Sequence, residues 1–201
     1  SGRIGASLAA DGTDVIGLDR NFDALRLASS RGLRCVAADM RHFRLRRRFQ
    51  RIIIPFCGLY CLLIDDDVVA CLINARRHLA AGGQVIFDGY AVNESALAAT
   101  TQRTSPEKVA EVQVAGHWWD VSESTVVWPD SQRIDATYVH VPRGGGRPIK
   151  ATIRQRFLSS FELPDLLATA GLMLVALHGN FDGDAYGPMS EHLVVRAERW
   201  R

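Results

Sequence analysis

The fold is decided by residues 14–19, which read Asp-Val-Ile-Gly-Leu-Asp, a short apolar run that ends in a carboxylate. Such a run, bounded by turn residues, predicts a buried strand. Residues 21–31 follow with apolar side chains at helical spacing and predict an amphipathic helix that Gly32 closes. Residues 34–39 are a second apolar run that ends in aspartate. Apolar runs that alternate with helical patterns indicate βαβ units around a parallel sheet.

The alternation extends over the first 90 residues. We expect helices over residues 3–10 and 68–79, and further strands over residues 49–55 and 84–88. Three of the expected strands therefore finish in a carboxylate, namely in Asp19, Asp39 and Asp88. In open α/β sheets, ligands bind at the carboxyl ends of the strands. The sequence thus predicts a ligand site at that edge.

The character of the chain changes after Tyr90. Residues 91–114 are polar and weakly patterned, and the stretches that follow alternate with period two between turn residues. We interpret residues 91–157 as an inserted antiparallel β meander. Its strands are expected over residues 117–128, 133–141 and 148–157, and a helix at 164–170 and strands at 172–177 and 192–197 complete the chain.

Composition limits the class of protein. The chain has 201 residues, 47% of them hydrophobic and 23% charged, which is ordinary for one soluble globular domain. No apolar run approaches the roughly 20 residues of a membrane span, and no signal peptide is visible. The four cysteines have neither disulfide-scaffold nor zinc spacing. We therefore expect a cytoplasmic protein with reduced thiols, no metal and no membrane partner, whose oligomeric state is open.

An arginine-rich segment is the one local departure from an even charge distribution. The formal net charge of +2 argues against a nucleic-acid partner. A basic cluster can nevertheless bind phosphates. It also falls where a polar connection between two strands is expected, and we favour that interpretation. The segment contains Arg41, Arg44, Arg46, Arg47, Arg48 and Arg51.

Taken in order, these elements resemble the class I S-adenosylmethionine-dependent methyltransferases. Residues 1–5, Ser-Gly-Arg-Ile-Gly, resemble the end of that family's glycine-rich loop, and residues 79–85 resemble its helix-to-strand turn. The resemblance implies a Rossmann-like sheet with a terminal antiparallel hairpin. It divides the chain into a cofactor-binding core, residues 1–90 and 158–201, and an inserted substrate-side lid, residues 91–157. It also implies that the family's first strand precedes Ser1, so that the chain is N-terminally incomplete.

The resemblance implies a binding site for S-adenosylmethionine. Gly2 would allow close approach of the backbone to the ligand. Asp19 would accept hydrogen bonds from both ribose hydroxyls. Asp39 would reach the exocyclic amine of the adenine, and Met40 would pack on the ring. Arg20, beside Asp19, and Phe56, in the loop after the third strand, complete the expected cofactor contacts.

The expected acceptor site lies between the core and the insert. Trp118, Trp119 and Arg154 are the candidate substrate-binding residues, with aromatic walls that suit an amine or a sulfonium. Adjacent tryptophans on one strand point to opposite faces, so at most one faces the pocket. Tyr90 and His178 are the candidate catalytic residues, with His178 either a general base or a loop histidine with a structural hydrogen bond.

Three functional hypotheses follow. The leading one is methyl transfer to a small-molecule amine or hydroxyl by in-line displacement, which needs neither a protein nucleophile nor a metal. The second makes the acceptor an RNA or a protein that the arginine-rich segment binds. The third keeps the fold as a non-catalytic interaction domain.

Overall fold

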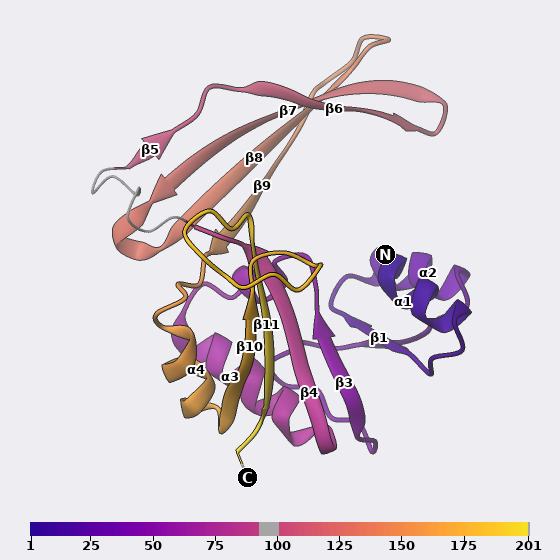
Figure 1. Ribbon diagram of the computed structural model, residues 1–201. Coiled ribbons are helices and arrows are strands. Elements are labelled where there is room, and N and C mark those ends of the chain that lie inside the picture. Colours follow the sequence, from indigo (N-terminus) through magenta and orange to yellow (C-terminus); the bar gives the residue numbers. More distant parts are fainter. Residues whose placement is uncertain (93–100, 201) are drawn as a thin grey trace.

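The computed structural model describes residues 1–92 and 101–200, which form three sheets. The smallest sheet pairs β1 (Ile16–Asp19) with β2 (Arg34–Ala37) in parallel. Helices α1 (Arg3–Ala10) and α2 (Phe22–Ser30) lie beside these two strands, and together they form a lobe at the side of the molecule (Figure 1). We call this unit the N-terminal lobe.

A four-stranded sheet forms the centre of the molecule, in the order β10-β11-β4-β3. Strands β3 (Phe49–Ile54) and β4 (Leu79–Tyr90) are parallel. Strand β11 (His192–Arg199) runs antiparallel to β4 and to β10 (Leu172–His178). The parallel pairs and this reversed last strand are those of the Rossmann-like fold that the sequence predicts.

Two helices cover one face of the central sheet and build the core with it. These are α3 (Asp65–Arg77) and α4 (Leu163–Thr169), and a short 3-10 turn, η1 (Leu59–Cys61), closes one end. Tyr60, Phe87 and Phe157 are the largest fully buried side chains. Each such side chain contributes roughly 1.5–3 kcal/mol through removal of apolar surface from water. Among the described residues no helix is both long and apolar enough to cross a membrane.

Helix α3 begins three residues before the predicted start at residue 68. Its first turn consists of Asp65, Asp66 and Asp67. Carboxylates are stabilised at a helix N-terminus because the free N–H groups there carry partial positive charge. The apolar periodicity that indicated the helix begins only at Val68, so the acidic turn was missed.

The third sheet is antiparallel and extends above the central sheet (Figure 1). We call it the overhanging sheet. The prediction missed β6 because its alternating polar residues resemble a loop in sequence; residues 93–100 of the same predicted polar stretch lie outside the described residues. The sheet contains β5 (Gln102–Arg103), β6 (Glu107–Val114), β7 (His117–Trp128), β8 (Arg133–Pro142) and β9 (Ile149–Arg156), with the short turn η3 (Pro129–Ser131) between β7 and β8.

Arg156 joins the base of the overhanging sheet to the core. Its side chain is only 7% exposed, and Nη2 lies 2.8 Å from the carboxylate of Asp65 and 2.7 Å from that of Glu162. It also donates to the side-chain oxygen of Gln132 at 3.0 Å. One buried guanidinium thus links β9, the turn before β8 and the first turn of α3.

We expect Arg156→Ala to lower the free energy of unfolding by about 2–4 kcal/mol, because it leaves Glu162 without its buried cation. Arg154→Ala is the matched control, since Arg154 is 65% exposed and reaches Asp135 only at 3.8 Å. Urea denaturation of both variants measures the difference. Equal stability of the two variants would contradict the anchoring role of Arg156.

Candidate functional site

The segments that follow β1 and β2 meet at the contact of Arg20 with Asp39, and the loop after β3 meets β4 at the hydrogen bond of Phe56 to Asp88. Two contacts there join the N-terminal lobe, and the segment that follows it, to the loop after β3 and to α3. The guanidinium of Arg3, at the start of α1, lies 4.6 Å from the ring centroid of Phe56. Arg41, after β2, lies 2.8 Å from the carboxylate of Asp67 in α3. These contacts bring together residues that are far apart in the sequence.

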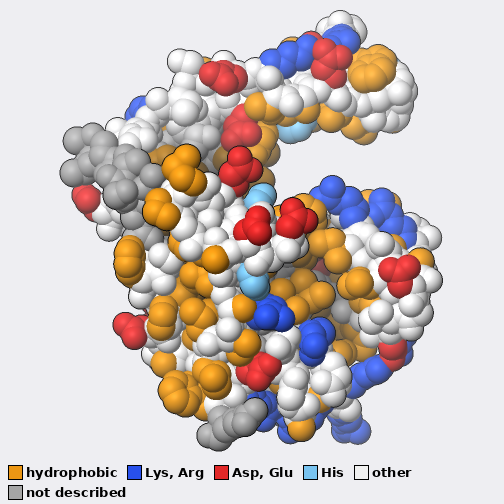
Figure 2. Space-filling view, in the orientation of Figure 1, with side chains coloured by type: hydrophobic (Ala, Val, Ile, Leu, Met, Phe, Trp, Pro, Cys, Tyr) orange, Lys and Arg blue, Asp and Glu red, His pale blue; other side chains and the backbone are white. Residues whose placement is uncertain are grey.

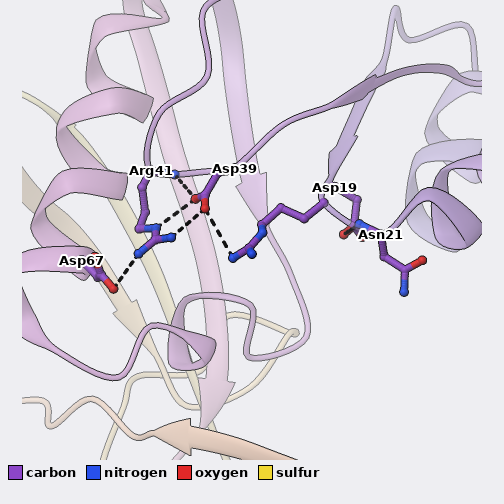
Figure 3. A network of polar contacts seen from close by, with 6 residues as sticks. Asp19, Asn21, Asp39, Arg41 and Asp67 are labelled. Carbon is purple, nitrogen blue, oxygen red and sulfur yellow. Dashed lines mark hydrogen bonds and ion pairs between the residues drawn. The ribbon is translucent and has the colours of Figure 1, made fainter.

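Asp19 lies at the end of β1 and is exposed. Its carboxylate accepts a hydrogen bond from the N–H of Asn21 at 3.0 Å, and the Asn21 side chain in turn caps α2 by accepting from Asp23 and Ala24 (Figure 3). In the described part of the chain Asp19 forms no ion pair. It therefore keeps most of its acceptor capacity, as the predicted ribose contact requires.

Asp39 is engaged far more fully than the sequence suggested. Arg41 donates to it from Nη2 at 2.7 Å, from Nε at 3.0 Å and from its backbone N–H at 2.9 Å (Figure 3). The guanidinium of Arg20 adds a contact at 3.4 Å. These hydrogen bonds hold the pKa of Asp39 well below its ordinary value, because they stabilise the ionised form. Arg41 was missed as a site residue, although an arginine two residues after the acid was a visible signal.

Gly2 and Met40 have structural explanations in addition to their predicted cofactor roles. Gly2 has a φ of 72°, and a Cβ there would lie 2.8 Å from the Cβ of Ala28. Only glycine fits this contact between the start of α1 and α2. Met40 is half-buried and packs against the core of the central sheet. Their contacts with a cofactor remain predictions.

Phe56 lies in the loop after β3 and is 61% exposed. Its N–H donates to both carboxylate oxygens of Asp88, at 3.1 Å each. Asp88, at the end of β4, is half-buried, and this burial raises its pKa, whereas the backbone N–H groups of Phe56 and Cys57 lower it. Sequence reasoning placed Asp88 at this edge and gave it no role.

The two candidate catalytic residues differ in chemistry. The hydroxyl of Tyr90 is buried without a hydrogen-bond partner among the described residues, and burial raises its pKa. His178, at the end of β10, has Nδ1 2.9 Å from the carbonyl oxygen of Gly183. A carbonyl only accepts, so in the neutral ring Nδ1 carries the hydrogen and Nε2 holds the lone pair. His178 can thus accept a proton while it makes the structural hydrogen bond that was the alternative interpretation.

The register of the overhanging sheet separates the three candidate substrate residues. Val127 and Ile134 are opposite each other in β7 and β8, and both pack against the core. Trp119 shares that inward face, because it lies an even number of residues from Val127. Trp118 and Arg154 lie on the outward face, where Arg143 stacks on Trp118 at 5.7 Å. This placement favours Trp119 as the one that faces the site.

The two faces of the overhanging sheet differ in charge. On the outward face, Asp120 is paired with Arg143 at 2.7 Å and with Lys108 at 2.9 Å. The inward face of β7 and β8 has no lysine or arginine, and its carboxylate, Glu123, lies opposite Tyr138. Figure 2 shows a deep notch between this sheet and the body below it, with acidic side chains on both sides. The notch lies between the overhanging sheet and the body that contains the central sheet and the N-terminal lobe (Figures 1 and 2).

The arginine-rich segment lies along the carboxyl-terminal half of α3. It lines a hollow of about 780 Å³ together with Asn74, Arg77 and His78. His78 accepts from the N–H of Leu45 at 3.1 Å, and Arg48 donates to the carbonyl of Arg77 at 2.9 Å. Part of the segment therefore caps the end of α3, as a polar connection would. That the segment binds an RNA or a protein as methyl acceptor stays a hypothesis.

Solved structures resemble this chain over nearly its whole length, and three of them serve as examples. The CcbJ methyltransferase from Streptomyces caelestis is 22% identical, with a TM-score of 0.84, and the match covers 100% of this chain and 80% of that one. An S-adenosylmethionine-dependent methyltransferase from Clostridium acetobutylicum is 14% identical, with a TM-score of 0.81 and the same coverage. An amino pentose methyltransferase from Micromonospora echinaspora, solved with S-adenosylmethionine, is 20% identical, with a TM-score of 0.67 over 98% of this chain and 79% of that one.

No model of a known protein family matches the sequence, and no curated protein sequence matches it. The structural similarities confirm the predicted fold, which is that of the S-adenosylmethionine-dependent methyltransferases. At these identities they establish the fold and leave the activity to be argued from the site.

The Asp39–Arg41 contact predicts a pH dependence of stability. The pKa of Asp39 lies below its ordinary value of 3.8, so the contact stabilises the fold above that pH and is lost as the pH falls further. Asp39→Asn should therefore cost on the order of 1–2 kcal/mol at pH 7 and pH 5, and less at pH 3. Urea denaturation at the three pH values measures it, with exposed Asp23→Asn as the control. A difference that did not change with pH would refute this assignment.

Proposed function

We propose that this chain binds S-adenosylmethionine at the edge formed by Asp19 and Phe56 and transfers its methyl group to a small molecule in the notch. The observation that carries the proposal is Asp19, an exposed carboxylate at a strand end with no cation on it among the described residues. It stands where the fold predicts the contact with a ribose. The fold itself, shared with methyltransferases across nearly the whole chain, supports the same conclusion.

The residues present fit this cofactor at its ribose and at its reactive end. Asp19 offers free lone pairs to two hydroxyl groups. The exposed ring of Phe56 offers an aromatic face, which attracts a positively charged sulfur. At the adenine end fewer acceptor positions are free, because Arg41 and Arg20 already contact the carboxylate of Asp39. An adenine amine would share this carboxylate with Arg41 and displace the more exposed Arg20.

The chain's own groups orient the acceptor and take up its proton. When bound, S-adenosylmethionine supplies a methyl group on a sulfonium that is already activated for displacement. The protein therefore contributes alignment and exclusion of water. An amine or hydroxyl acceptor loses a proton when it is methylated, and Nε2 of His178 is available to accept it. The buried, protonated Tyr90 can donate a hydrogen bond to the acceptor.

The inward face of the overhanging sheet favours an amine over a hydroxyl as the acceptor. Glu123 has no cation on it among the described residues, whereas the carboxylates Glu111, Asp120 and Asp135 of the outward face are all paired. Glu107 lies directly across from Glu123 in β6, so two carboxylates face each other. Such a pair is unfavourable until a cation binds. The similar protein from Micromonospora echinaspora, described as an amino pentose methyltransferase, supports the same acceptor class.

Calorimetry with S-adenosylmethionine and with S-adenosylhomocysteine tests the function, in a protein that includes any segment preceding Ser1. We expect binding of both, and Asp19→Ala should weaken it by about 1.5–3 kcal/mol, the contribution of hydrogen bonds to a charged group. Asp23→Ala, in the same region and exposed, should leave the affinity unchanged. Absence of heat with either compound would favour the non-catalytic interaction domain instead.

The acceptor class is tested with a pair of probes, an amino pentose and the matching pentose with a hydroxyl in place of the amine. We expect Glu123→Gln to raise the KM for the amino pentose about tenfold, since one charge-assisted contact is lost, and to leave the hydroxyl analogue unaffected. Glu111→Gln, on the outward face, is the control. If both probes respond alike, Glu123 does not recognise an amine.

A further inference from the structure

The carboxylate of Asp88 is placed to hold one backbone turn. Both of its oxygens lie 3.1 Å from the N–H of Phe56, and the N–H of Cys57 also contributes to it. The side chain is half-buried and has no ion pair within the described residues. A half-buried carboxylate without a cation is unfavourable unless its hydrogen bonds serve the structure or the function.

The turn that Asp88 holds has an unusual backbone. Phe56 has a φ of 56° and Cys57 a φ of 54°, so two consecutive non-glycine residues are left-handed. Side chains with a Cβ rarely adopt this region because the Cβ approaches the following carbonyl oxygen. Gly58 follows at once with an ordinary φ of −58°. The strain thus falls on the two residues that bear side chains, although a glycine is adjacent.

A second contact fixes the same turn to the end of β4. A Cβ at Gly89 would lie 2.2 Å from the ring of Tyr60, so the ring packs directly on the backbone of β4. The Tyr60 hydroxyl also donates to the carbonyl of Tyr90 at 3.0 Å. The three last residues of β4 therefore contact both ends of the segment from Phe56 to Tyr60.

The strained turn presents the ring of Phe56 outward. Phe56 is 61% exposed, and the guanidinium of Arg3 lies 4.6 Å from the centroid of its ring. An exposed aromatic ring, a strained backbone and an unpaired carboxylate each lower stability. Features of this kind, found together, mark functional sites in folded proteins.

We propose that Asp88 is a positioning residue, which holds the Phe56–Cys57 turn in its left-handed conformation so that the Phe56 ring faces the cofactor. The inference rests on the proposed function. Asp88 contacts neither cofactor nor acceptor in this role. It acts through the two backbone N–H groups, and the ring of Phe56 makes the contact.

The test is a rescue experiment with four variants. Asp88→Ala removes the acceptor, so hydrogen exchange of the Phe56 amide should accelerate about tenfold and the affinity for S-adenosylhomocysteine should fall by a similar factor. Asp88→Asn keeps one acceptor oxygen and should retain most of both. Cys57→Gly, added to Asp88→Ala, should restore much of the affinity, because glycine adopts a positive φ without strain, whereas exchange of the Phe56 amide should stay fast because its acceptor is still missing. Asp23→Ala is the control and should change neither.

Two results would overturn the proposal. One is an Asp88→Ala variant with unchanged amide exchange and unchanged affinity. The other is a variant that is destabilised throughout and that Cys57→Gly does not rescue, which would make Asp88 a purely structural residue. Amide exchange needs no cofactor, so the two proposals can fail separately. If no variant binds S-adenosylhomocysteine while exchange follows the expected order, Asp88 holds the turn and the methyltransferase proposal falls.

Discussion

The arrangement of this molecule depends on the acidic first turn of α3. Asp65 binds Arg156 at the base of the overhanging sheet, and Asp67 binds Arg41 after β2. The positive end of the helix dipole offsets the mutual repulsion of these neighbouring carboxylates. One turn of helix therefore fixes both parts that flank the notch. Because the two ion pairs share this turn, the segment after β2 and the base of the overhanging sheet are bound to the same element.

The candidate site combines a firmly packed strand with carboxylates that have no ion pair among the described residues. Tyr60 and Phe87 are fully buried beneath the end of β4, so the strand that carries Asp88 is firmly packed. Above it, Asp19 and Glu123 keep carboxylates without cations among the described residues. On the outward face of the overhanging sheet, by contrast, Glu111, Asp120 and Asp135 are each paired with a cation. The two faces of that sheet therefore differ in the negative charge that they leave unpaired.

Much of the fold could be predicted because it depends on local patterns. Period-two alternation placed β7 and β8 and separated Trp118 from Trp119, and strand ends identified Asp19. Contacts between distant residues could not be predicted in this way. The hydrogen bond from Phe56 to Asp88 joins the loop after β3 to β4, and a left-handed φ at Phe56 has no sequence signal when glycine is absent there. The outward placement of Arg154 likewise needed the register of β8 with β9.

The overhanging sheet extends away from a base that Arg156 anchors to the core. Strand β7 has 12 residues and begins at the tip of the sheet. At about 3.3 Å per residue, the tip lies roughly 40 Å from the base. By this geometry a tilt of about 5° at the base moves the tip by roughly 3 Å, which is close to the size of a methyl group. Small changes at the base are therefore enlarged along the sheet, and the buried guanidinium of Arg156 holds the angle that sets the width of the notch.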